Sequence, residues 1–132
     1  MGRSELRKHI FRMLFLIEFN GEDEMPEQAE LYLDDMEGLS DKDRTYITAK
    51  HAKVVERIKE IDDILNTHTT GWKTSRMNKV DLSILRLAVY EMKWDDEIPV
   101  GVAINEAVEL AKKYSGDEGP SFVNGVLARL AG

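Results

Sequence analysis

Basic and aromatic side chains recur at helical spacing near the start of the sequence. Lys8 and Arg12 lie one turn apart on the side of a predicted helix that faces away from its apolar stripe, with Phe15 beside them. Arg3 and Arg7 lie one turn apart on another flank, where we expect both to be exposed. Single-stranded RNA is bound in this way, since cations pair with phosphates and a ring stacks on an unpaired base. The pattern also fits cations that only solvate a helix and phenylalanines that pack inward.

The charge distribution favours one oriented contact over general nucleic-acid binding. The 132 residues carry a net charge of −7, whereas phosphate contacts need a local excess of lysine and arginine. Residues 1–13 carry a net charge of +3, and residues 18–43 carry eleven carboxylates and one lysine. We expect the acidic segment either to keep RNA away from its side or to meet a basic partner.

Covalent chemistry has little support in the sequence. There is no cysteine, which excludes disulfides, thiolate metal sites and cysteine nucleophiles. The histidines His9, His51 and His68 fall in different segments without metal-ligand spacing, and no glycine-rich phosphate loop is present. The carboxylates are interpreted as solvated helix faces rather than an acid–base pair. We therefore expect no enzyme, no cofactor and no metal site.

Length and hydropathy indicate a small protein of the cytoplasm. A chain of 132 residues suits one compact domain. No apolar run approaches the roughly 20 residues that cross a bilayer, and no signal-peptide pattern is present, so no membrane association is expected.

Apolar residues recur with the 3.6-residue period of amphipathic helices along nearly the whole chain, which predicts an all-α fold. The expected helices span about residues 4–19, 26–37, 41–65, 81–94, 99–115 and 120–130, with a short turn at 72–77. A hinge is expected at residues 67–71. The simplest architecture is two packed three-helix bundles, about 1–70 and 71–132, in one domain.

Polar residues and glycines add local expectations. Ser4, Ser40 or Asp41, and Asp81 are the expected helix N-caps. Asn105 and Asn124 lie on otherwise apolar helix faces, so both amides are expected to be buried and hydrogen-bonded. Gly125 lies inside a predicted helix, where a close approach of another element would explain it.

The C-terminal half resembles the NusB family in the order and spacing of its motifs. The matching runs are Val80-Asp81, Ile84 to Ala88, Tyr90 to Met92, Ile98-Pro99, Ala103 to Lys112, and Phe122 to Leu127. In the N-terminal half, Arg3, Arg7 and the Leu14-Phe15 pair stand where the family has its arginine-rich first helix. Residues 20–70 match in pattern and length only.

The resemblance implies a role in bacterial transcription antitermination on ribosomal RNA operons, within the transcription elongation complex. Family members bind the boxA element of nascent RNA, usually as a heterodimer with NusE, a small-subunit ribosomal protein. Some relatives dimerise over their RNA face, so a homodimer, or a self-association module without an RNA role, is the alternative.

Carried over by position, the resemblance implies RNA contacts for Arg3, Arg7 and Phe15, with Asp81 and Asn124 near the same surface. Lys8 and Arg12 are added to this set from helical spacing alone. Few arginines precede the first helix, and Glu5 lies among the cations. We therefore predict weak RNA binding by the protein alone and tighter binding with its partner.

Overall fold

Helices account for the regular structure of the protein. The computed structural model describes residues 1–20, 25–68 and 73–132. Over these three stretches it contains α-helices and one 3₁₀ turn and no strand, so the predicted all-α class is confirmed. No helix in this part of the chain is long and apolar enough to cross a membrane.

The chain divides into two compact units, Met1–Glu56 and Arg57–Gly132. The expected boundary near residue 70 therefore lies well inside the second unit. The long helix expected over 41–65 is instead two helices, α4 (Asp41–Glu56) and α5 (Ile58–His68), interrupted at Arg57. Neither proline nor glycine marks this break. The Arg57 guanidinium lies 4.6 Å from the centre of the Trp94 ring, so a contact within the second unit accompanies the break between the two helices.

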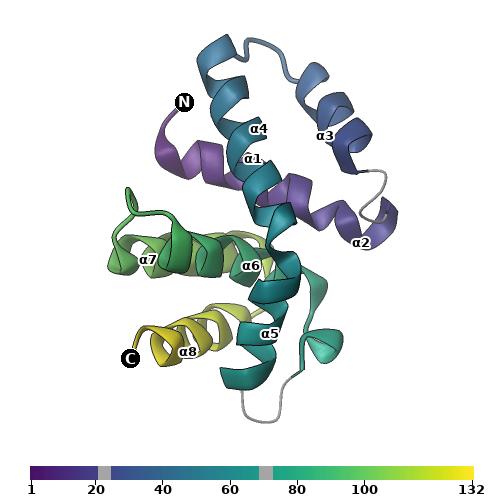
Figure 1. Cartoon of the computed structure of the whole chain (residues 1–132). Coiled ribbons are helices and arrows are strands. Elements are labelled where there is room, and N and C mark those ends of the chain that lie inside the picture. The colour runs from purple at the N-terminus through teal and green to yellow at the C-terminus, as the bar shows by residue number, and fades with distance from the viewer. Residues whose placement is uncertain (21–24, 69–72) are drawn as a thin grey trace. The chain divides into compact units, whose positions relative to one another are not determined.

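In the first unit, α1 (Arg3–Phe15) packs against both α3 (Met25–Asp34) and α4, and α2 (Ile17–Asn20) follows α1 (Figure 1). The buried apolar residues recur at helical spacing: Leu6, Ile10, Phe11, Met13 and Leu14 on α1, Ala29 and Leu33 on α3, and Ile47 and Val54 on α4. Because α1 touches both other long helices, the side chains of α1 not facing them form a defined surface.

The ends of these helices differ in detail from the expectations. Gly2 rather than Ser4 is the N-cap of α1, whereas Ser40 does begin α4 by accepting a 3.1 Å hydrogen bond from the Asp43 amide. α3 ends at Asp34, and Gly38 has a φ of +73°, which places it in the turn that follows.

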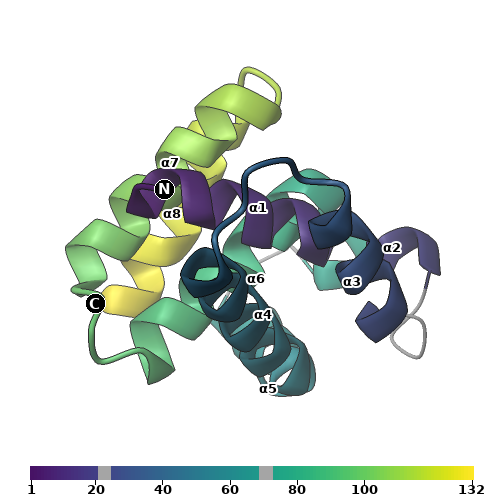
Figure 2. The same cartoon turned by 90° about the horizontal axis from the view of Figure 1, so that it is seen from above.

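The second unit consists of α5, the 3₁₀ turn η1 (Thr74–Arg76), α6 (Lys79–Trp94), α7 (Val100–Tyr114) and α8 (Gly119–Ala131). α6, α7 and α8 pack on one another, and α5 packs on α6 and α8 (Figure 2). Every residue of α6 from 81 to 91 is buried, as expected for a helix surrounded by neighbours. Asn78, not Asp81, caps α6 by accepting a 2.8 Å hydrogen bond from the Val80 amide. Asp81 is therefore available for another contact.

Three further expectations fail in this unit. Asn105 and Asn124 are exposed, because each lies at the edge of its apolar stripe. Gly125 is also exposed, and a Cβ atom built there would meet no atom within 4 Å. The hinge expected at residues 67–71 falls largely on residues 69–72, which lie outside the described residues.

Candidate nucleic-acid interface

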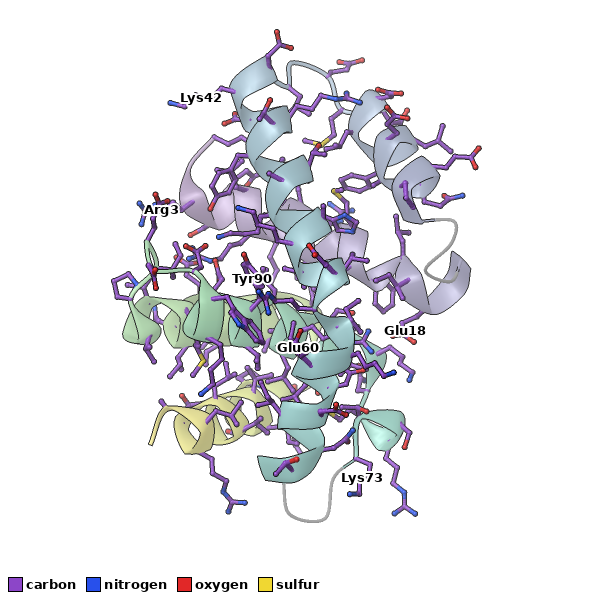
Figure 3. The ribbon with its side chains drawn as sticks, viewed as in Figure 1. Arg3, Glu18, Lys42, Glu60, Lys73 and Tyr90 are labelled. Carbon is purple, nitrogen blue, oxygen red and sulfur yellow. The ribbon has the colours of Figure 1, made fainter. Side chains whose placement is uncertain are left out.

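The exposed cations of α1 are Arg3 in its first turn and Arg12 in its last turn. Figure 3 shows the Arg3 side chain extending away from the ribbon. No ion pair joins either arginine to another residue of the described stretches. Two guanidinium groups at the two ends of one helix are therefore available to pair with phosphates, each with a planar fork of donors.

Arg7 is not one of these exposed cations, so the expectation that its side chain is exposed is wrong. Its side chain is only 3% exposed. The physical reason is the helical wheel: at 100° per residue, Arg7 lies within about 20° of Leu14 and so in the middle of the buried stripe. Ile10 and Phe11, which flank that direction, are buried as well. Arg7 is thus an interior residue of the structure, not a surface cation.

Lys8 is on the predicted face, but its charge is partly compensated. Its Nζ lies 2.5 Å from Glu5 Oε1, one turn earlier on α1. The same Glu5 oxygen lies 3.5 Å from His9 Nε2. Glu5 therefore reduces the positive potential over the middle of α1, and Arg3 and Arg12 carry most of the accessible charge.

The two phenylalanines of α1 separate into different roles. Phe11 is 3% exposed and belongs to the core, as the alternative interpretation of these rings allowed. Phe15 is half-buried, at the C-terminal end of the helix. Only Phe15 therefore offers part of its ring for stacking on a base, one turn beyond Arg12.

The start of α1 is fixed by a salt bridge with α4. The N-terminal ammonium of Met1 lies 3.1 Å from Asp43 Oδ2. Its hydrogen bond to this carboxylate lowers the pKa of Asp43 below the usual range. Lys42, next to Asp43, is exposed (Figure 3). Lys42, which is not among the predicted RNA-binding residues, is therefore an exposed cation next to Asp43, the residue that binds the N-terminal ammonium.

Asp81 and Asn124 both lie in the second unit, and they differ in accessibility. Asp81 is 7% exposed and accepts a 2.6 Å hydrogen bond from the Ser115 hydroxyl at the end of α7. A Cβ atom at Gly119, the first residue of α8, would overlap Ser115 and lie 3.3 Å from Asp81 Oδ1. Asp81 therefore supports the turn between α7 and α8, while the Asn124 side chain is exposed on α8.

Sequence reasoning missed Ser115, Gly119 and the pairing of Glu5. Ser115 is 34 residues from Asp81 along the chain, and no local sequence pattern indicates a contact between residues so far apart. Glu5 is three residues before Lys8, so helical spacing could have identified that pair.

No cluster of three or more His, Cys, Asp or Glu side chains suited to a metal occurs among the described residues. His9 instead shares a 2.8 Å hydrogen bond between Nδ1 and the Tyr32 hydroxyl. Burial, followed by the positive charge of Lys8, lowers its pKa. His9 is thus held within the first unit as a neutral side chain.

Comparisons with known proteins agree over nearly the whole chain. The NusB family model matches residues 4–132. A protein of Agathobacter rectalis named transcription antitermination protein NusB is 52% identical over 131 residues, which cover 99% of this chain and 100% of that protein.

Two solved structures extend the comparison to three dimensions. The structure of T. maritima NusB superimposes with a TM-score of 0.91 at 32% identity, covering 99% of this chain and 91% of that one. A structure of antitermination factors NusB and NusE in complex with dsRNA gives a TM-score of 0.84 at 27% identity, covering 96% and 92%.

Proposed function

The chain belongs to the NusB family, and on this premise we propose that it is a transcription antitermination factor that binds boxA-type single-stranded RNA together with NusE. The observation that carries the proposal is the exposure of Arg3 and Arg12 on α1 of an otherwise acidic protein. Each of these two guanidinium groups can pair with a phosphate, and neither has an ion-pair partner among the described residues, whereas the net charge of −7 disfavours RNA elsewhere.

Full-length similarity to named relatives supports this function. The Agathobacter rectalis relative, named for antitermination, covers the chain from end to end. The superimposed structure with NusE and RNA spans 96% of the chain. The action proposed here takes place in the cytoplasm, on nascent ribosomal RNA transcripts, as part of the transcription elongation complex.

In the proposed mechanism, RNA is held by charge and stacking without covalent chemistry. Arg3 and Arg12 pair with phosphates, and Lys8 contributes once phosphate replaces Glu5 as its partner. Phe15 stacks on one unpaired base, and the exposed amide of Asn124 offers hydrogen bonds to RNA. We propose no catalytic role for any residue.

Arg7 and Asp81 act indirectly in this proposal. Both side chains are buried, so neither meets RNA in the conformation described. Arg7 lies on the buried side of α1 itself, and Asp81 accepts a hydrogen bond from the Ser115 hydroxyl. Their substitution is expected to alter stability first and RNA affinity only as a consequence.

The test is a fluorescence anisotropy titration of labelled boxA RNA with the protein alone and with its cognate NusE. A scrambled RNA of the same composition serves as the control. The proposal predicts selective binding of boxA that tightens when NusE is present. Equal affinity for both RNAs in both titrations would contradict the antitermination role and leave self-association as the function to examine.

A further inference from the structure

A groove of about 660 Å³ lies between α3 and α4 in the first unit. α4 packs on α1, as does α3, and residues of both α3 and α4 line the groove. Its apolar lining consists of Pro26, Ala29, Leu33, Ala52 and Val55. A groove of this size accommodates a few large apolar side chains. It shares no lining residue with the proposed RNA-binding set.

Three carboxylates surround this apolar lining. Glu27 and Glu30 lie one turn apart on α3, and Glu56 ends α4. All three are exposed, and none of them forms a hydrogen bond or an ion pair with a described residue. They repel phosphate, so the groove does not suit RNA. Three carboxylates at separate positions complement several cations carried by one peptide. They therefore favour an extended basic ligand over a single small ion.

A buried histidine forms part of the groove wall. His51 is 5% exposed and lines the groove. Its Nε2 atom has no hydrogen-bond partner among the described residues. Buried polar atoms are nearly always paired, so an unpaired Nε2 on a residue that lines the groove points to a partner group supplied by a ligand in the groove. A hydroxyl suits this position, because it can donate to or accept from a neutral imidazole.

We propose that the α3–α4 groove is a docking site for a basic amphipathic helix of a protein partner. Its apolar face fills the groove, a hydroxyl such as that of tyrosine pairs with His51 Nε2, and its lysines or arginines face Glu27, Glu30 and Glu56. An amphipathic helix that lays its apolar face into a hydrophobic groove is a recurring mode of protein recognition. The proposal goes beyond the RNA-binding function and does not depend on it.

The probe is a synthetic amphipathic peptide with leucines and one tyrosine on one face and lysines on the other. It is titrated into the full chain at neutral pH and low salt, and the imidazole ¹⁵N resonances of His51 are followed by NMR. We expect saturable binding that shifts the His51 Nε2 resonance. The same peptide with glutamates in place of lysines is expected not to bind.

Two variants localise the effect. Glu27→Gln/Glu30→Gln is expected to weaken peptide binding about fivefold, whereas Asp96→Asn/Glu97→Gln, exposed carboxylates of the second unit, is expected to leave it unchanged. Ala52→Trp, at an exposed position of the groove, is expected to abolish peptide binding and to leave the circular dichroism spectrum and boxA affinity unchanged.

Three results would overturn the proposal. They are an unchanged His51 resonance at saturating peptide, equal loss of affinity in the two charge variants, and normal peptide binding by a folded Ala52→Trp protein. Because RNA affinity is measured on the same Ala52→Trp sample, failure of this proposal is distinguishable from failure of the RNA-binding function.

Discussion

The Nζ atom of Lys8 lies 2.5 Å from Glu5 Oε1, one turn back along α1, on the helix that carries the exposed arginines. The Glu5 side chain is 47% exposed, so it competes for this lysine with any phosphate that approaches. An acidic residue within a cationic surface limits RNA affinity without changing the fold. The weak RNA binding predicted for the protein alone has its structural origin in this pair.

Glu5→Gln is therefore expected to strengthen boxA binding about threefold, since an exposed ion pair of this kind contributes about 0.5 kcal/mol and the repulsion of phosphate is also removed. Anisotropy titrations at about 0.05 M and about 0.2 M salt measure the effect, because salt screens the interaction between these charges and RNA. Glu37→Gln, an exposed carboxylate elsewhere in the first unit, is the control. Weaker binding by Glu5→Gln would show that Glu5 contacts RNA itself.

Arg7→Ala is expected to destabilise the protein by about 2–4 kcal/mol, because it removes a long side chain from the interior. Arg12→Ala, one to two turns later and exposed, is expected to change stability by less than about 0.5 kcal/mol. Urea unfolding followed by circular dichroism compares the two variants. Equal stability of both would mean that Arg7 is not held in the interior in solution.

Gly119→Ala and Gly125→Ala are expected to change stability in opposite directions. A Cβ atom at Gly119 overlaps Ser115 beside Asp81, so the substitution forces the α7–α8 turn apart at a cost of about 1–3 kcal/mol. A Cβ atom at Gly125 meets nothing within 4 Å. Alanine there is expected to stabilise α8 by up to about 1 kcal/mol. Thermal unfolding measures both, and destabilisation by Gly125→Ala would contradict the described packing of α8.

His51 is expected to make stability depend on pH below neutrality. Burial lowers the pKa of His51 from 6.5 to about 4. Between these values the unfolded chain binds a proton that the folded chain does not, so the free energy of unfolding falls as the pH falls. The contribution is complete above pH 6.5, is lost progressively toward pH 4, and amounts to about 3 kcal/mol.

Urea unfolding at several pH values between 4 and 7 measures this dependence, with His51→Gln as the comparison. The pKa of His9 is also lowered, so the difference between the two proteins, rather than either curve alone, isolates His51. Parallel curves for the two proteins would show that His51 is not buried in its neutral form.

Much of the helical core was predictable because burial follows the 3.6-residue period. Ile10, Leu14, Ile61, Leu85 and Leu127 occupy apolar positions of that period, and all are fully buried. The same helical spacing places Arg7 in the buried stripe, in line with Leu14. Residue type misled the prediction there, since arginine is usually exposed.

Other features depend on contacts that local sequence does not encode. The break at Arg57 has no proline or glycine, and it accompanies a contact with Trp94, 37 positions further along the chain. The close approach predicted at Gly125 occurs instead at Gly119, where Ser115 and Asp81 meet. Asn124 lies at the edge of the apolar stripe of its helix. At such an edge, a small difference in the direction of the side chain around the helix axis decides whether the side chain is buried or exposed.

Whether the exposed arginines of α1 bind RNA is measured by the salt dependence of boxA affinity for Arg3→Ala/Arg12→Ala. The matched control is Lys59→Ala/Lys93→Ala, which removes two exposed cations from α5 and α6. Loss of two phosphate contacts is expected to weaken binding about tenfold or more and to reduce the slope of log K against log salt by about 1.4.

In measurements made with NusE present, the control pair is expected to keep both the affinity and the slope of the unmodified protein. If the α1 variant, shown by circular dichroism to be folded, retains the same slope as the control, then α1 is not the RNA-binding surface and the proposed interface is wrong.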